Sequence, residues 1–137
     1  MITIDGEKHK ATWLQGLEQT ADIMNGENSG RLQATGKMHL EYLGTYFNHK
    51  GNLRRDADCS DDEWEALFRV LARPVNKHTG SFPFGVNQVL DQEVYISQVV
   101  RTLVFAKETN QWENAYAVTF TAISPAWLPG GTIKGLS

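Results

Sequence analysis

The strongest constraint on the fold is the alternation of apolar and polar residues in the last third of the chain. Residues 89–97, 101–107 and 112–123 each have strand character, and a turn at residues 108–111 separates the last two. Alternation with a period of two is typical of a strand that buries one face. The sequence therefore predicts a β scaffold here. The residues expected to share a face are Leu90, Val94 and Ile96, then Leu103 and Phe105, then Tyr116, Val118, Phe120 and Ala122.

One helix is predicted ahead of these strands. Ser60 and Glu63 form an S-x-x-E capping box, which satisfies two backbone amides at a helix N-terminus. Apolar residues then recur at i, i+3, i+4 and i+7, so they form one stripe. Pro74 stops the helix. The sequence predicts a helix over residues 60–72, with a stripe that consists of Trp64, Leu67, Phe68 and Leu71.

The chain opens with the pattern of a β-hairpin. Residues 2–4 alternate apolar and polar side chains, and Asp5-Gly6 follows. Asp-Gly is a strong two-residue hairpin signal, because glycine adopts a positive φ at no steric cost. We expect residues 7–14 to form the return strand, with Trp13 or Leu14 touching the core.

The stretch between this hairpin and the helix combines loop-like and strand-like segments. Residues 21–30 are polar and contain glycine, so we expect an exposed loop there. Residues 37–50 have strand chemistry, and Gly44 inside that pattern predicts a β-bulge. Residues 48–52 are typical of a turn or of the end of a strand.

Composition narrows the functional classes. The chain is 41% hydrophobic and 21% charged with a net charge of -3, values that are ordinary for a soluble globular protein. A nucleic-acid-binding surface needs a surplus or stripe of basic residues, whereas the basic residues here are scattered. We find neither a signal peptide nor an apolar stretch near the roughly 20 residues that span a bilayer. We expect a cytosolic product without a membrane anchor.

An acidic run from Asp56 to Glu63 raises the question of calcium. Its start resembles an EF-hand loop, but Asp61 and Leu67 occupy the two positions that require glycine and glutamate. The run also leads directly into the predicted helix cap. A capped and solvated helix start is therefore the preferred interpretation, with a cation site as the alternative.

The remaining reactive residues form no catalytic motif. Cys59 is the single cysteine, so it excludes an internal disulfide and a zinc site of several thiolates. It lies near the predicted helix N-terminus, but no base or orienting partner accompanies it in the sequence. The histidines, which show no metal-binding spacing, are His9, His39, His49 and His78. We predict no enzyme activity, no cofactor and no metal site.

A wider pattern runs through most of the chain, from residue 2 to residue 129. Its segments are Ile4-Asp5-Gly6, Gln92-Glu93-Val94-Tyr95-Ile96, Arg101-Thr102-Leu103, Asn110-Gln111-Trp112, Ala117-Val118-Thr119-Phe120-Thr121-Ala122 and Pro125-Ala126-Trp127, with a V-x-F-x-A-x-x-P ending. In these segments and in the position of its helix, the chain resembles tail-tube-type proteins of long-tailed bacteriophages. That group includes the N-terminal domain of distal tail (baseplate hub) proteins.

The resemblance implies a mostly β fold with one α-helix (α+β). We expect an antiparallel β-sandwich or incomplete barrel with the helix packed on one side. Residues 1–129 would form one domain, and residues 130–137 a flexible C-terminal tail.

The resemblance also implies a function. Such subunits commonly form hexameric rings, in which strands of neighbours close an inner barrel around the DNA channel. We expect a virion structural protein of a phage or prophage tail, made in the bacterial cytoplasm, that binds copies of itself and other tail proteins. DNA would pass through the channel without specific binding. Aromatic residues are enriched in interface cores, and the candidates here are Trp13, Trp127, Tyr95 and Phe84.

Two alternatives stay open. A tail assembly factor, a head–tail connector or a terminator would show the same periodicity. A small enzyme or ligand-binding β domain would instead need a concave pocket with converging polar groups. The residues that could supply such a pocket are His39, His49 and the carboxylates of residues 56–62.

Overall fold

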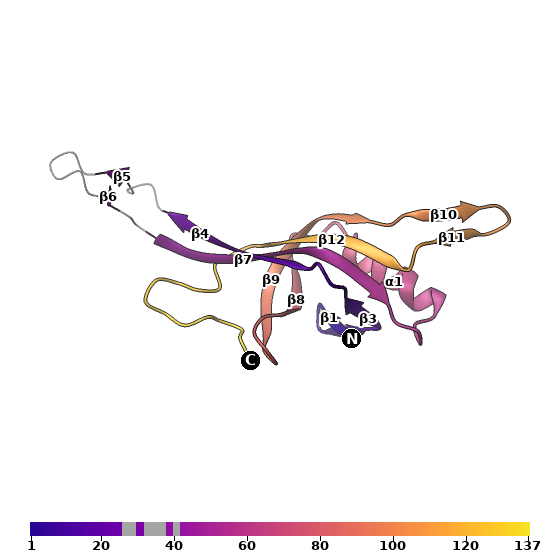
Figure 1. Cartoon of the computed structure of the whole chain (residues 1–137), viewed down its shortest axis with the longest axis horizontal. Coiled ribbons are helices and arrows are strands. Elements are labelled where there is room, and N and C mark those ends of the chain that lie inside the picture. The colour runs from indigo at the N-terminus through magenta and orange to yellow at the C-terminus, as the bar shows by residue number, and fades with distance from the viewer. Residues whose placement is uncertain (26–29, 32–37, 40–41) are drawn as a thin grey trace.

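The computed structural model describes residues 1–25, 30–31, 38–39 and 42–137. It shows an elongated molecule, in which two hairpins extend in opposite directions from a central body (Figure 1). The elements are β1 (Ile2–Ile4), β2 (Glu7–His9), β3 (Ala11–Trp13), β4 (Glu18–Asn25), β5 (Gly30–Arg31), β6 (Met38–His39), β7 (Tyr42–Arg55), α1 (Asp61–Leu71), β8 (His78–Pro83), β9 (Val89–Val100), β10 (Leu103–Ala106), β11 (Asn110–Trp112) and β12 (Ala115–Ala122).

The central body is an antiparallel sheet that curls toward a barrel. Its strands lie in the order β2-β1-β8-β9-β12-β7-β3, and β4 pairs with the first half of β7. Because β1 also contacts β3, the two ends of the sheet approach each other. The prediction of a mostly β fold with one helix, as an antiparallel β-sandwich or incomplete barrel, is therefore confirmed, and the sheet is nearly closed.

The first hairpin forms at the predicted turn. Asp5 and Gly6 have φ values of 53° and 81°, as a two-residue turn with a right-handed twist requires. The return segment is not one strand, however. It divides at Lys10 into β2, which pairs with β1, and β3, which pairs with β7. The Lys10 carbonyl accepts a hydrogen bond from the Asp56 amide, which fixes the crossing point.

The helix matches its prediction closely. Ser60 is the N-cap, and both hydrogen bonds of the capping box with Glu63 are present. Trp64 is buried and stacks on Tyr116 of β12, with ring centroids 3.9 Å apart. The Tyr116 hydroxyl donates a 2.6 Å hydrogen bond to the Trp64 carbonyl. The apolar stripe therefore holds the helix against one side of the sheet.

The core occupies the inner face of the body and has two parts. The larger cluster is centred on Phe82 and Phe120, whose rings contact each other with centroids 5.0 Å apart. The alternating face of β12 is buried as predicted, and so are Leu90 and Val94 of β9. A smaller cluster contains Phe47, Leu90 and Ala126. It packs where the C-terminal segment covers the sheet.

Two predictions for the middle of the chain were wrong. Residues 21–25 belong to β4 rather than to an exposed loop, while residues 26–29 lie outside the described part. Residues 48–52 do not end a strand, because β7 continues to Arg55. In both cases a partner strand supplies backbone hydrogen bonds that override the local polar composition. The bulge at Gly44 is confirmed, since the β4–β7 register skips Leu43 and Gly44 has φ 140°.

The C-terminal segment is docked, which differs from the flexible tail that we predicted. Val89 and Ser137 exchange two backbone hydrogen bonds of 2.9 Å, and the Gly135 carbonyl accepts one from the Asp91 amide. The physical reason is an open position in the sheet. β12 pairs with β9 only as far as Val94, so residues 89–91 have free backbone groups on that side for the C-terminal segment.

Candidate assembly surfaces

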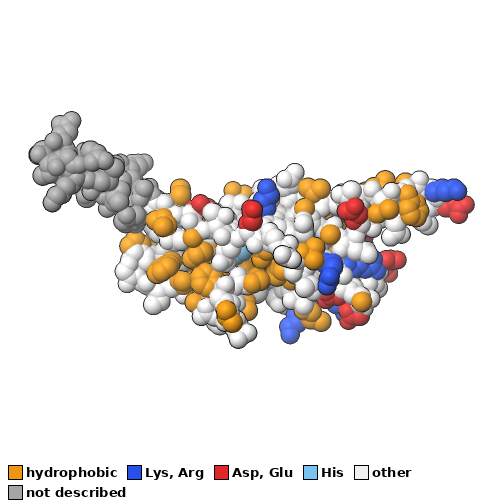
Figure 2. Space-filling model, in the orientation of Figure 1, with side chains coloured by type: hydrophobic (Ala, Val, Ile, Leu, Met, Phe, Trp, Pro, Cys, Tyr) orange, Lys and Arg blue, Asp and Glu red, His pale blue; other side chains and the backbone are white. Residues whose placement is uncertain are grey.

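The β10–β11 hairpin forms an apolar arm that projects beyond the body (Figure 1). Leu103, Val104 and Phe105 are 43%, 57% and 54% exposed. Figure 2 shows hydrophobic side chains along this arm as far as its charged tip. Leu103 and Phe105 were predicted to share a face of a sheet strand. The strand exists, but no second layer covers the arm among the described residues, so its apolar side chains face solvent.

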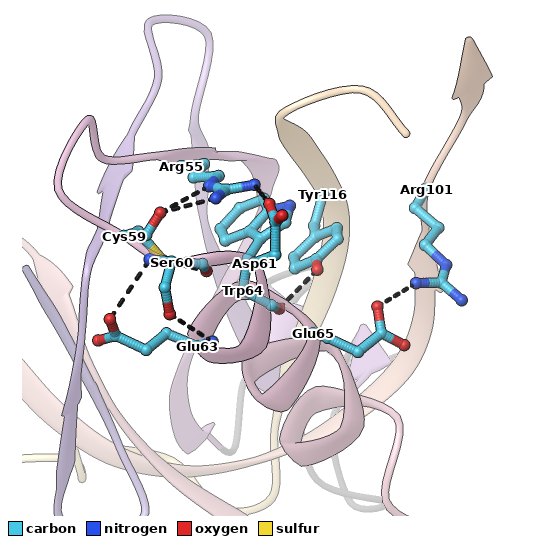
Figure 3. A network of polar contacts seen from close by, with 9 residues as sticks. All are labelled: Arg55, Cys59, Ser60, Asp61, Glu63, Trp64, Glu65, Arg101 and Tyr116. Carbon is cyan, nitrogen blue, oxygen red and sulfur yellow. Dashed lines mark hydrogen bonds and ion pairs between the residues drawn. The ribbon is translucent and has the colours of Figure 1, made fainter. Parts of the chain in front are cut away.

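The base of the arm is held by Arg101. Its guanidinium lies 4.1 Å from the ring centre of Phe68 on α1 and 4.2 Å from that of Trp112 on β11. It also forms a 2.7 Å ion pair with Glu65 of α1, drawn in Figure 3. Cation–π contacts of this kind contribute about 0.5–2 kcal/mol each. Arg101 therefore fixes the direction of the arm relative to the helix.

The acidic run beside the arm has a structural role. Arg55 donates two hydrogen bonds to the Cys59 carbonyl, at 3.0 and 2.7 Å, and pairs with Asp61 at 2.8 Å (Figure 3). Within the described residues, no group of three or more histidine, cysteine or acidic side chains could hold a metal ion. The Cys59 side chain is buried, and burial raises the pKa of its thiol. A raised pKa disfavours the thiolate that a nucleophile needs.

A second apolar surface lies at the opposite end of the molecule. We call it the Trp127 groove, and its lining residues are Ile23, Gly44, Thr45, Trp127, Leu128, Pro129 and Gly130. Ile23 is 61% exposed and Trp127 is 45% exposed. The C-terminal segment lies beside β7 at Thr45, where it leaves Ile23 and its own Trp127 exposed.

The walls of this groove are joined by backbone contacts. Thr45 and Trp127 form an isolated bridge, with a 2.8 Å hydrogen bond from the Thr45 amide to the Trp127 carbonyl. The Trp127 indole donates to the Gly131 carbonyl at 2.9 Å. Gly44 permits this close approach, because a Cβ there would lie 2.7 Å from Pro125 Cβ and 2.8 Å from the Trp127 carbonyl oxygen.

The four aromatic interface candidates divide into two pairs. Trp127 and Tyr95 are exposed, and Trp127 lines the groove. Trp13 and Phe84 instead contact aromatic rings of their own chain: Trp13 packs against Phe82 and Phe120, and Phe84 packs edge-on against Phe47. The arm itself was not predicted from the sequence. Three consecutive apolar residues at positions 103–105 break the alternation, and this was the available signal.

The histidines whose side chains the structure describes do not converge on a cleft. His49 is buried in the core and stacks on Phe82 with ring centroids 4.2 Å apart, while His78 is buried against Asp5 at 2.8 Å. Burial lowers the pKa of His49 to about 4. The carboxylate of Asp61 pairs with Arg55 rather than with a histidine. The side chain of His39 lies outside the described part of the structure.

In the part of the chain that the structure describes, we find no helix with the length and apolar character of a membrane span. Comparisons with family models, curated proteins and solved structures gave no match to this chain.

Proposed function

We propose that this chain is a structural protein of a phage or prophage tail, of the tail-tube or distal-tail (baseplate hub) type. It assembles with copies of itself into a hexameric ring around the DNA channel and acts without catalysis. The observation that carries the proposal is the pair of exposed apolar surfaces at opposite ends of one elongated β body. The resemblance of the sequence segments to tail proteins supplies the class.

Exposed apolar surfaces of this kind favour assembly. Soluble monomers rarely expose large contiguous apolar patches, and such patches commonly mark sites of protein–protein interaction. The arm has no core of its own to stabilise it, since Leu103, Val104 and Phe105 are all exposed. A partner that covers these side chains would supply the missing burial.

An available strand edge supports the same proposal. Among the described elements, β4 pairs only with β7, so its outer edge offers unpaired backbone groups. Exposed edges favour pairing with a strand of another chain. In a ring, a neighbouring subunit would use such an edge to extend the sheet from one copy to the next.

The outer face of the sheet suits a channel through which DNA moves. A concave surface there is lined mainly by small or uncharged residues, and the charged residues among those described are Glu18 and Lys50. The others are Gly16, Gly51, Asn52, Gln98, Val100, Ala117, Val118 and Thr119. Binding to DNA phosphates depends on clustered lysine and arginine. We propose that this face borders the channel and lets DNA pass without retention.

The test combines electron microscopy with analysis of particles. The purified chain, concentrated and stained, is expected to show rings with a central channel. Mass spectrometry of particles from the bacterium that encodes the chain is expected to detect it in the tail. A protein that stays monomeric at every concentration and is absent from particles would refute the proposal. Association without incorporation into particles would instead identify an assembly factor.

A further inference from the structure

We infer that the apolar arm of one copy docks into the Trp127 groove of a second copy. This inference rests on the proposed function and specifies the contact between subunits. Its partner is the chain itself, and its two halves are Leu103–Ala106 of β10 on one copy and the groove around Trp127 on the other.

The chemistry of the two surfaces matches. The β10 strand consists of leucine, valine, phenylalanine and alanine. The described residues that line the groove are isoleucine, threonine, tryptophan, leucine, proline and glycines, and none of these is charged. Joining them would remove apolar surface from water and would bury no charge, so no desolvation penalty for an ion opposes the contact.

The placement of the two surfaces requires two copies. The arm and the β4–β7 hairpin point in opposite directions from the body (Figure 1), so the arm cannot fold back into its own groove. A contact between two different surfaces is heterologous, and repeated heterologous contacts close into a ring or continue as a filament. Each copy would use its arm toward one neighbour and its groove toward the other.

The small exposed area limits how strong the contact can be. Each surface exposes only a few large apolar side chains, whereas stable interfaces bury about 1,200–2,000 Å² in total. They are Leu103, Val104 and Phe105 on the arm and Ile23, Trp127 and Leu128 in the groove. The arm–groove contact alone is therefore weak. It would become effective when each copy makes it twice in a closed ring, together with strand-edge contacts.

The arm is also prepared for docking. Arg101 holds its base between Phe68 and Trp112 and pairs with Glu65. A segment that is already held in its bound direction loses less conformational freedom on binding. Arg101 is therefore a positioning residue for the contact, since its side chain is occupied by these three partners.

Chemical cross-linking tests the pairing directly. Phe105→Cys and Leu128→Cys are prepared as separate proteins, mixed at high concentration and treated with a short bis-maleimide. The native Cys59 is buried. We expect several-fold more heterodimer than in a control mixture of Phe105→Cys with Val86→Cys, although Val86 is 91% exposed and therefore more accessible. Equal yields in the two mixtures would overturn the inference.

A charge substitution provides an independent measurement. Phe105→Asp places a charge on the arm without touching the core, so its unfolding midpoint should match that of the native chain. Sedimentation velocity should show self-association weakened about tenfold or more. The matched control, Val86→Asp, should leave association unchanged. Equal association of the two variants would contradict the contact.

The outcomes separate this inference from the proposed function. Rings or particles that contain the chain, with no preferred arm–groove cross-link, would refute the inference and leave the proposed function standing. A different tail protein cross-linked to the arm in particles would do the same. A chain absent from particles that forms the arm–groove cross-link would support the contact and refute the tail function.

Discussion

Acid should destabilise the folded chain through His49. Its side chain is 1% exposed and stacks on Phe82. Its Nε2 lies 2.8 Å from the side-chain nitrogen of Gln19, which also donates to the Pro83 carbonyl at 3.0 Å. That second bond fixes the amide orientation, so Nε2 of His49 acts as an acceptor. A proton on Nε2 would face this donor inside the core.

The size of the effect follows from the pKa of His49. Burial lowers it from 6.5 to about 4. Between these values the unfolded chain binds a proton that the folded chain does not, so stability falls as the pH decreases through this window. A difference of about 2.5 pKa units corresponds to about 3 kcal/mol. This is a large fraction of the roughly 5–15 kcal/mol that stabilises a typical domain.

Urea unfolding measured by tryptophan fluorescence, at several values between about pH 7 and pH 4.5, checks this prediction. His49→Gln is the control, because glutamine keeps a hydrogen-bonding side chain and does not titrate. The variant should be less stable at neutral pH but should lose much less stability on acidification. Other titrating groups contribute equally to both proteins, so the difference between the two slopes isolates His49. Parallel loss of stability in the two proteins would refute the reasoning.

Further predictions concern Asp5, Ser60, Tyr116 and Arg101. Burial alone would raise the pKa of Asp5, but hydrogen bonds from the Thr79 amide and His78 outweigh it, so the pKa is lowered. The native chain should therefore lose stability below about pH 4 as this carboxylate is protonated. Urea unfolding should show a smaller loss in Asp5→Asn. Ser60→Ala should cost about 1 kcal/mol by removing the helix cap, measured as a lower thermal midpoint. Tyr116→Phe should cost about 1 kcal/mol, because the bond to the Trp64 carbonyl is lost, and a double-mutant cycle with a stacking variant would separate bond from stacking. Arg101→Ala should increase hydrogen exchange of amides in β10 while leaving those of β9 and β12 protected.

Local patterns predicted those elements whose partners lie within a short stretch of chain. The capping box between Ser60 and Glu63 spans one helical turn, and both of its bonds are present. The Asp5-Gly6 turn depends on two φ angles that the residues themselves favour. The buried face of β12 follows from its strict alternation. In each case residues close together in the sequence are sufficient to predict the element.

Elements set by distant partners could not be predicted in the same way. β7 passes through Asn48 and Gly51 without ending, because β12 pairs along one side and β3 and β4 along the other. The C-terminal segment is ordered by an open position on β9 that only the finished sheet reveals. The apolar run within residues 101–107 correctly indicated a strand, which is β10. The sequence could not show whether other parts of the same chain cover these apolar side chains.

Stability and assembly should be separable in this fold. Neither core cluster includes Leu103, Val104 or Phe105 of the arm, nor Ile23 or Leu128 of the groove. Changes at these positions remove no contact within the core, whereas changes at His49 or Tyr116 act on the core itself. Substitutions at these exposed positions should therefore weaken self-association without unfolding the chain. If instead Phe105→Asp unfolded the chain, the arm would belong to the folding unit, and its exposed apolar side chains could no longer be taken as surface reserved for a partner.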